Sequence, residues 1–514
     1  MKTELYSKDI VSNFSYTTYA MILNRVGNLI FSIILARFLM PEGFGIYNLA
    51  LSVSLVIVIF SDLGIDVTLT RYLTKSLKAG NIPLAKAYTE YILKIKTILS
   101  FVAALILLII AYPLSNSFFG KPELFVPLIV CSFYLFASSF EGTLRVFFYV
   151  MNKVKYFAIK ESIFQTLKIV ILILVFYFVS AQHYVLAALI VITLISFLFI
   201  PYYLYYIYQF AGFIFREKRV ANINKKKVII FMSQLTIGGV TAVVFSYIDT
   251  IIMGASLPAE YVGYYRAAFG IIYSIFGLFS FSNVLLPFYN RMNKDRLIRA
   301  LSRTIKYSAM VTIPSIFGIV ALSSYIIRLF FGYEYLPAAL PLSISAILIF
   351  EMVHTGILMS FYQSIGKIKF YTIMVVVSTL LNLALNIMVV VILRSHSDIL
   401  IMNLIACVTV ITRYFLLLSL FFNIKMKYEV KIVPGYLIKP ILASAVMFAI
   451  LYSINIWLAG GMSAFIGLSE IIMGCVIYFL VLYFIGGVNL NDFKLASHLM
   501  PSWFKKILPG YDLL

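Results

Sequence analysis

Runs of about twenty apolar residues recur along the whole chain, and they constrain its fold more than any other feature. Each of these fourteen runs has the length that an α-helix needs to cross a bilayer. They are about twice as long as a barrel strand and lack its strict alternation. The sequence therefore predicts an all-α integral membrane protein with about fourteen transmembrane helices. The runs lie at residues 14–38, 44–68, 91–113, 124–149, 158–180, 184–210, 228–254, 262–287, 305–331, 338–363, 370–393, 398–423, 434–458 and 463–485.

Composition agrees with this class and excludes others. Hydrophobic residues make up 62% of the 514 positions and charged residues only 12%, about half the share of a soluble domain. The net charge of +21 is spread over short turns between apolar runs, which argues against a nucleic-acid partner. The three cysteines Cys131, Cys407 and Cys475 lie inside apolar runs and show no metal-ligand spacing. We expect no metal centre and no cofactor.

Lysine and arginine gather on alternate turns, which predicts the orientation of the chain in the membrane. The turns near 75, 155, 220, 296, 368 and 430 are basic, whereas 181–183 and 255–261 contain no Lys or Arg. Basic turns stay on the cytoplasmic side of a membrane. We therefore expect both termini in the cytoplasm and the turns near 41, 118, 182, 257, 334, 396 and 460 outside. We also expect the chain to lie in the cell (cytoplasmic) membrane and to be a monomer.

A short repeat links the first and second halves of the chain. The segment that ends the first run and opens the second matches the segment between runs seven and eight, at a shift of 218 residues. Such parallel repeats are typical of transporters that rock two bundles around a central cavity. The predicted domains are 1–215 and 216–425 as two six-helix lobes, 426–486 as two further spans, and 487–514 as a cytoplasmic tail. The matching pairs are Glu42 and Glu260, Gly45 and Gly263, Tyr47 and Tyr265, and Ala50 and Ala268.

The opening motif carries a resemblance to a known family. The stretch from Leu35 to Tyr47, with Pro41-Glu42-Gly43 at its centre, is followed by Phe60-Ser61-Asp62-Leu63-Gly64 and Thr70-Arg71-Tyr72. These residues resemble the start of polysaccharide flippases of the MOP superfamily, which also holds the MATE exporters and the lipid II flippases. The resemblance implies movement of a lipid-linked oligosaccharide between leaflets. It also implies that the last two spans offer an apolar groove for the polyprenyl chain.

Ionisable groups deep in a membrane are functional candidates by default, and several occur here. A guanidinium is suited to a diphosphate because it is planar and keeps its charge. A carboxylate or histidine suits coupling to Na⁺ or H⁺. Each candidate also has a purely structural interpretation. These are a buried ion pair of Arg25 or Arg413 with Glu351, a Lys168 side chain that extends to the membrane interface, and asparagines that only form hydrogen bonds between helices. The candidates for substrate binding are Arg25, Arg413, Arg266 and Lys168, those for ion coupling are Glu351, His354 and Asp249, and those for a polar cavity are Asn382 and Asn386.

Three functions remain at this point. A flippase for lipid-linked oligosaccharide leads, and a MATE-type cation-coupled drug or metabolite antiporter is the main alternative. A membrane-embedded glycosyltransferase is disfavoured because the predicted outer turns are short. The chain carries no nucleotide-binding P-loop sequence, so we expect neither ATP hydrolysis nor enzyme activity. The longest predicted loops, near 69–90 and 288–304, are basic.

Overall fold

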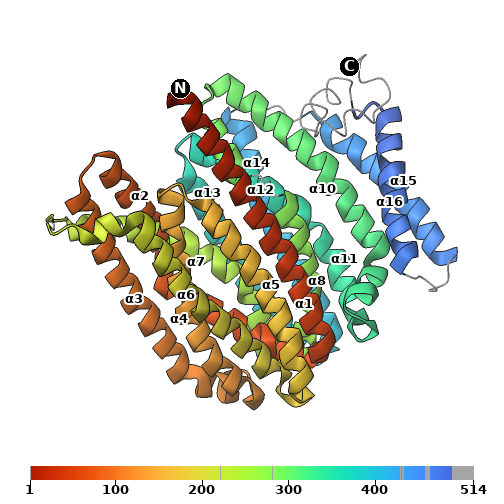
Figure 1. The fold of residues 1–514 in the computed structure, drawn as a ribbon. Helices are drawn as coiled ribbons and strands as arrows, with labels where there is room; N and C mark the ends of the chain where they lie inside the picture. Colours follow the sequence, from red (N-terminus) through yellow and green to blue (C-terminus); the bar gives the residue numbers. More distant parts are fainter. Residues whose placement is uncertain are drawn as a thin grey trace.

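The computed structural model describes residues 2–219, 221–279, 282–428, 430, 433–457 and 464–488, and helices make up nearly all of this part of the chain (Figure 1). The N-terminal half, as we call it, consists of α1 Lys2–Asp62, α2 Ile65–Lys78, α3 Ile82–Pro113, α4 Phe125–Val150, α5 Val154–Phe178 and α6 Tyr184–Arg216. The C-terminal half consists of α7 Lys225–Ser256, α8 Ala259–Phe279, α9 Ser282–Tyr289, α10 Lys294–Phe330, α11 Ala339–Ala346, α12 Leu348–Ser364, α13 Ile368–Ile392 and α14 Asp398–Tyr428. The helices α15 Gly435–Trp457 and α16 Ala464–Phe484 follow.

The helices agree with the predicted membrane architecture. Eleven helices in the described part of the chain are long and apolar enough to cross a membrane. One of them, Ser15–Lys78, covers two predicted spans, and the shorter apolar helices Val243–Ser256 and Ser469–Phe484 lie on two others. The all-α membrane fold is confirmed. The count of fourteen spans and the division into four segments stay predictions, and nearly all of the predicted tail lies outside the described residues.

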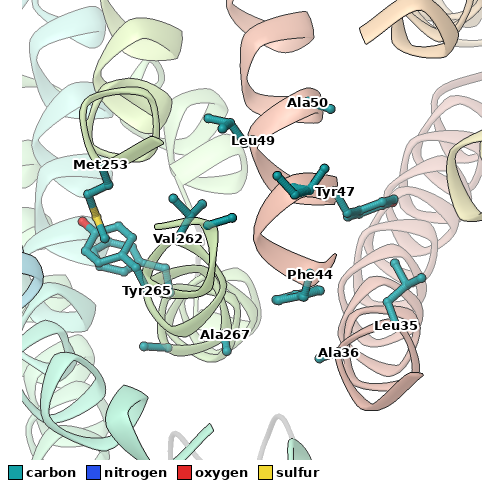
Figure 2. Packing of buried hydrophobic residues seen from close by; sticks show 14 of the residues in the cluster. Leu35, Ala36, Phe44, Tyr47, Leu49, Ala50, Met253, Val262, Tyr265 and Ala267 are labelled. Atoms are coloured by element: carbon teal, nitrogen blue, oxygen red, sulfur yellow. The ribbon is translucent and has the colours of Figure 1, made fainter. Parts of the chain in front are cut away.

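The first two predicted spans join in α1 at a sharp kink. Met40 has a φ of 56° and a ψ of 173°, far from helical values. A proline disfavours the helical conformation in the residue before it and is well placed at the start of a new helix, and Pro41 follows Met40. The two parts of α1 therefore form separate helices, seen in Figure 2 with Leu35 and Ala36 on one and Phe44 to Ala50 on the other.

Matching turns before α5 and α13 support the predicted internal repeat. Asn152 has a φ of 55° and Gly366 a φ of 69°. Asparagine and glycine are the residues that adopt this left-handed conformation most readily. The lysine after each, Lys153 or Lys367, donates its backbone N–H to the carbonyl five residues earlier, at 2.8 and 2.9 Å. The helices that follow are both 25 residues long, so the two halves use the same turn at corresponding places.

The prediction of two long basic loops, near 69–90 and 288–304, is wrong. Most of the first is helix, because α2 extends to Lys78 and α3 begins at Ile82, and α10 already begins at Lys294. In α2, Ile65, Leu69 and Leu73 are buried at a spacing of four residues, which is the apolar face of a helix. The helix thus places its basic residues on a surface rather than in a loop.

One hydrophobic core joins the two halves. The largest cluster among the described residues combines α1 with α7 and α8, and Figure 2 shows this packing. Leu49 of α1 and Val262 and Tyr265 of α8 are buried in it. The kink of α1 therefore lies where the two halves meet.

The last two helices stand outside both halves, at the edge of the molecule beside α10 (Figure 1). Tyr478 of α16 donates its hydroxyl to the carbonyl of Met310 in α10, at 2.7 Å. Met447 and Leu451 of α15 are buried in the same cluster as Met310. In the described contacts, α10 is therefore the main connection between this pair and the rest of the bundle.

Candidate functional site

A cavity of about 650 Å³ lies between α1 and the C-terminal half. Its size falls within the range of about 300 to 1,000 Å³ that is typical of small-molecule sites. The N-terminal half contributes one helix, α1, through Arg25, Asn28, Leu29 and Ser32. The remaining lining comes from α7, α8, α12, α13 and α14. The cavity is therefore shared by the halves but built mostly by the second.

Three of the four predicted substrate-binding cations meet in this cavity. Arg25, Arg266 and Arg413 all line it, and no described lining residue is Asp or Glu. A guanidinium keeps its charge under all ordinary conditions. The lining therefore presents fixed positive charge, and the acids nearest to it lie behind the lining.

Aromatic rings and a glycine position the arginines. The Cζ atom of Arg413 lies 3.9 Å from the ring centre of Phe245, and that of Arg266 lies 5.4 Å from the ring centre of Tyr247. Arg25 lies against Gly277, where an added Cβ would come within 2.7 Å of the arginine Cδ and Nε atoms. Ring faces hold a guanidinium without neutralising it, so the groups stay available to an anion.

The fourth predicted cation, Lys168, is not in the cavity lining. Its side chain is 3% exposed, and its Nζ donates to Asn28 Oδ1 at 2.6 Å. The same ammonium lies 4.5 Å from the ring centre of Phe31 and 5.6 Å from that of Phe164. The face of α5 that carries Lys168 packs against α1, so the lysine lies behind the cavity lining and is bonded to the lining residue Asn28.

Other charges in the N-terminal half are also paired within it. The Lys160 ammonium donates to Glu141 and lies 3.8 Å from Glu161 Oε2. Glu161 Oε1 in turn accepts from Asn24 Nδ2 at 2.6 Å and from Gln165 Nε2 at 2.8 Å. Lys160, Glu161 and Gln165 are all at least 95% buried. These contacts place one ammonium between two carboxylates, so the buried charges of this cluster form ion pairs within the N-terminal half.

Asp249, predicted for ion coupling, is the centre of a polar network in the C-terminal half. Its Oδ2 accepts from Tyr265 at 2.7 Å and from Thr409 at 2.6 Å, and its Oδ1 accepts from Asn386 Nδ2 at 2.7 Å. Asn386 Nδ2 also lies 3.2 Å from Asn382 Oδ1. Both asparagines are fully buried and lie outside the described cavity lining. The four elements α7, α8, α13 and α14 therefore meet on one carboxylate whose hydrogen-bond partners are neutral, and Arg413 interacts with it electrostatically.

An unsatisfied oxygen in this network bears on cation binding. Asn386 Oδ1 is buried and has no hydrogen-bond partner. Carboxylate, amide and hydroxyl oxygens are the ligands that hard cations take. Asp249, Asn382, Asn386 and Thr409 supply oxygens of these kinds, so the residue types fit a small cation. No group of three or more His, Cys, Asp or Glu side chains suited to a metal ion occurs among the described residues.

Glu351 and His354 lie one layer behind the cavity. Glu351 Oε1 accepts from Thr355, a cavity-lining residue, at 2.7 Å, whereas its Oε2 is buried without a partner. The expected ion pair with Arg25 or Arg413 is not formed, although Arg413 interacts electrostatically with Glu351. His354 is fully buried, stacks on Phe350 and contacts its carbonyl through Nδ1 at 2.7 Å. The helix face that the two residues share is thus directed into the protein.

A second feature is an apolar groove between α15 and the C-terminal half. Two adjoining hollows of about 470 and 1,110 Å³ share Phe350, Tyr414 and Leu437 in their lining. Nearly all of the other lining residues are apolar and come from α10, α12, α14 and α15. The groove runs along the inner side of the helix pair that stands outside the two halves.

Several cavity residues were not singled out from the sequence. Asn28 is three residues after Arg25 and shares its helix face, which is a spacing that could have identified it. Tyr247 and Tyr273 also line the cavity. With 37 tyrosines in the chain, nothing in a single sequence marks these two.

The fold resembles solved transporter structures along most of the chain. A structure of the lipid II flippase MurJ in an inward closed conformation has a TM-score of 0.67 and 17% identity, covering 92% of this chain and 98% of that chain. A multidrug resistance MATE family transporter of the MOP superfamily, in an inward-facing conformation, has a TM-score of 0.62 and 15% identity, covering 80% and 98%. At these identities the likeness concerns the fold.

Sequence comparisons give the family. The family model described as polysaccharide biosynthesis protein matches residues 10–293, which is more than half of the chain. An uncharacterized membrane protein of Methanocaldococcus jannaschii is 22% identical over 374 residues, covering 67% of this chain and 71% of the relative. The chain thus belongs to the polysaccharide biosynthesis protein family, and it is a multi-pass membrane protein whose fold resembles that of the lipid II flippase and the MATE transporter.

Proposed function

We propose that this transporter moves a lipid-linked oligosaccharide, a sugar chain on a polyprenyl diphosphate, across the cell membrane by alternating access. The observation that carries the proposal is the cavity lining, which holds Arg25, Arg266 and Arg413 and no described acid. A diphosphate needs several fixed donors, and planar guanidinium groups bind it with paired hydrogen bonds. The family description and the lipid II flippase fold point to the same class of cargo.

The sugars and the lipid tail have separate candidate sites. The tyrosines and polar side chains of the cavity, such as Tyr247, Tyr273 and Asn28, suit sugar rings and hydroxyls. The apolar groove beside α15 suits a polyprenyl chain, because its lining is nearly all hydrocarbon. We expect a chain truncated before residue 434 to keep its fold but lose flipping of polyprenyl substrates.

For energy coupling we propose the Asp249 network as the site for Na⁺ or H⁺. Asp249 joins α7, α8, α13 and α14, so a change of its charge acts on four helices of one half. Glu351 is a second candidate because one of its oxygens is buried without a partner behind the cavity. His354 has partners on both ring nitrogens and is the weakest of the three predicted coupling residues.

The second candidate function is a cation-coupled drug or metabolite antiporter, which the likeness to a multidrug transporter favours. A cavity with three arginines repels a cationic cargo, whereas an anionic cargo is attracted. The two functions therefore differ in the sign of charge of the cargo. An assay with one polyprenyl diphosphate sugar and one cationic dye separates them.

The test is a flipping assay in proteoliposomes with a polyprenyl diphosphate oligosaccharide. We expect Arg25→Ala to abolish flipping and Arg25→Lys to retain part of it, because an ammonium keeps the charge but not the planar donors. Arg394→Ala, in the turn after α13 and outside the cavity lining, is the matched control and should flip normally. A fully active Arg25→Ala would contradict the proposal.

A structural role of Arg25 gives a different pattern. If Arg25 only balances Glu351, the double variant Arg25→Ala with Glu351→Ala should regain the flipping that either single variant lacks. We expect no such recovery, because the two residues form no ion pair and only Arg25 lines the cavity.

A further inference from the structure

The repeated turn motif brings two glycines into direct contact across the two halves. An added Cβ on Gly45 would lie 1.8 Å from the carbonyl oxygen of Ala259, and one on Gly263 would lie 2.1 Å from that of Pro41. Real Cβ atoms do not approach other atoms below about 3 Å. The backbones of α1 and α8 can therefore meet here only because both residues are glycine.

The contact is reciprocal. Gly45 and Gly263 correspond to each other in the internal repeat, each four residues into the helix that follows its turn. Each meets the carbonyl of the first residue of the other helix, Pro41 or Ala259. A single helix crossing thus uses the same position of both halves, as a two-fold relation between them requires.

Further ties between the halves surround this crossing. Lys121 Nζ, in the turn after α3, donates to the carbonyl oxygens of Gly254 at 2.6 Å and Leu257 at 2.9 Å in the C-terminal half. Tyr335, fully buried in the C-terminal half, donates its hydroxyl to Ala36 O of α1 at 2.9 Å. All of these residues lie near the turns predicted to face outward.

The opposite end of the bundle is joined differently. The ring contacts between the halves there involve only the first part of α7: Arg71 lies 4.2 Å from the ring centre of Phe231, and Lys225 lies 5.6 Å from that of Tyr91. Such side-chain contacts rearrange easily, whereas the glycine crossing is backbone against backbone. Val228 and Met232 of α7 are also buried against the N-terminal half at this end. The close approach of backbone to backbone between α1 and α8 lies at the predicted outer end.

We infer that the Gly45–Gly263 crossing is the closing contact at the outer end of the transport path, and that it sets the preference for the state closed to the outside. The inference concerns which residues hold the path shut and does not depend on the identity of the cargo. A methyl group on either glycine must separate α1 from α8. Because closing requires this contact, the substitution shifts the population toward the state open to the outside.

The test measures access to the cavity from outside. The three cysteines are replaced, a reporter Ser246→Cys is placed in the cavity lining, and intact cells are treated with a membrane-impermeant maleimide. We expect slow labelling in this parent and at least about tenfold faster labelling after Gly45→Ala or Gly263→Ala, since about 1.4 kcal/mol corresponds to tenfold in a population ratio. Labelling of both glycine variants at the parent rate, with the proteins folded, would overturn the inference.

Two controls keep the test decisive. Gly43→Ala adds a methyl group in the same turn, but its nearest contacts are the side chains of Val185 and Leu39 within the N-terminal half, so labelling should stay at the parent rate. Size-exclusion profiles in detergent establish folding. If the glycine variants do not fold, Lys121→Met replaces them, because it removes a side-chain tie without adding bulk. We expect it to raise labelling by about threefold, and an unchanged rate would overturn the inference.

Discussion

The two halves of this protein repeat the same turns, but their buried charges are bonded differently. In the N-terminal half, the Lys160 ammonium lies between the carboxylates of Glu141 and Glu161, so the buried charges form ion pairs. In the C-terminal half, the hydrogen bonds described for Asp249 all come from neutral groups, and Arg413 interacts with it only electrostatically; one oxygen of Glu351 has no hydrogen-bond partner. The half whose buried carboxylates lack ion pairs is also the one that builds most of the cavity.

We infer from this difference that one half has a structural role and the other a chemical role. Buried ion pairs resist changes of pH and ion concentration, because each charge favours the charged form of its partner. A carboxylate held by neutral donors responds to a proton or cation, because either one relieves its unbalanced charge. We propose on this basis that the N-terminal half acts as a rigid partner, to which α1 adds one arginine, and that the C-terminal half carries the cargo and ion chemistry.

The largest expected effect is on the stability of the N-terminal half. Removing one partner of a buried ion pair leaves the other charge uncompensated, which costs about 3 to 5 kcal/mol. Lys160→Met should therefore lower the Tm of the purified protein strongly, and adding Glu141→Gln should restore much of it. Thermal unfolding in detergent measures both. A Lys160→Met protein as stable as the parent would break the contrast between the halves.

A smaller effect is expected at Asp249, together with a change in ion response. Asp249→Asn replaces one acceptor oxygen by an NH₂ group that faces donors, which costs about 1 to 3 kcal/mol. A ligand that binds only the folded state raises its stability. We expect NaCl, compared with choline chloride, to raise the Tm of the parent but not of Asp249→Asn. A sodium-dependent Tm that survives this substitution would place coupling elsewhere.

The smallest effect is expected at Lys168. Its ammonium has a neutral hydrogen-bond partner and two ring faces, so Lys168→Met exchanges a buried charge for an apolar chain of similar length. Such exchanges are often neutral in stability. We expect a Tm close to that of the parent and less than about a twofold change in the binding of polyprenyl diphosphate. Loss of polyprenyl diphosphate binding would instead show that Lys168 belongs to the substrate site.

The sequence predicted the fold class because apolar runs of helical length leave few alternatives in a membrane. It predicted the cavity position of Arg25 and Arg413 because a guanidinium at that depth must avoid lipid, and it named Arg266 only as a candidate for substrate binding. It did not predict the direction of Lys168, since depth says nothing about which face of α5 meets α1. It also did not predict that Thr409 and Tyr265 bind Asp249, because contacts across 160 and 16 positions depend on the packing of helices.

The binding of polyprenyl diphosphate to the purified protein tests the central claim most directly, with polyprenyl monophosphate and polyprenol as comparison ligands. The account predicts the tightest binding for the diphosphate. It also predicts at least about tenfold weaker diphosphate binding after Arg25→Ala, Arg266→Ala or Arg413→Ala, since a hydrogen bond to a charged group contributes about 1.5 to 3 kcal/mol. Arg394→Ala should bind like the parent. Equal affinity for diphosphate and polyprenol, or unchanged diphosphate binding in all three cavity variants, would contradict the account.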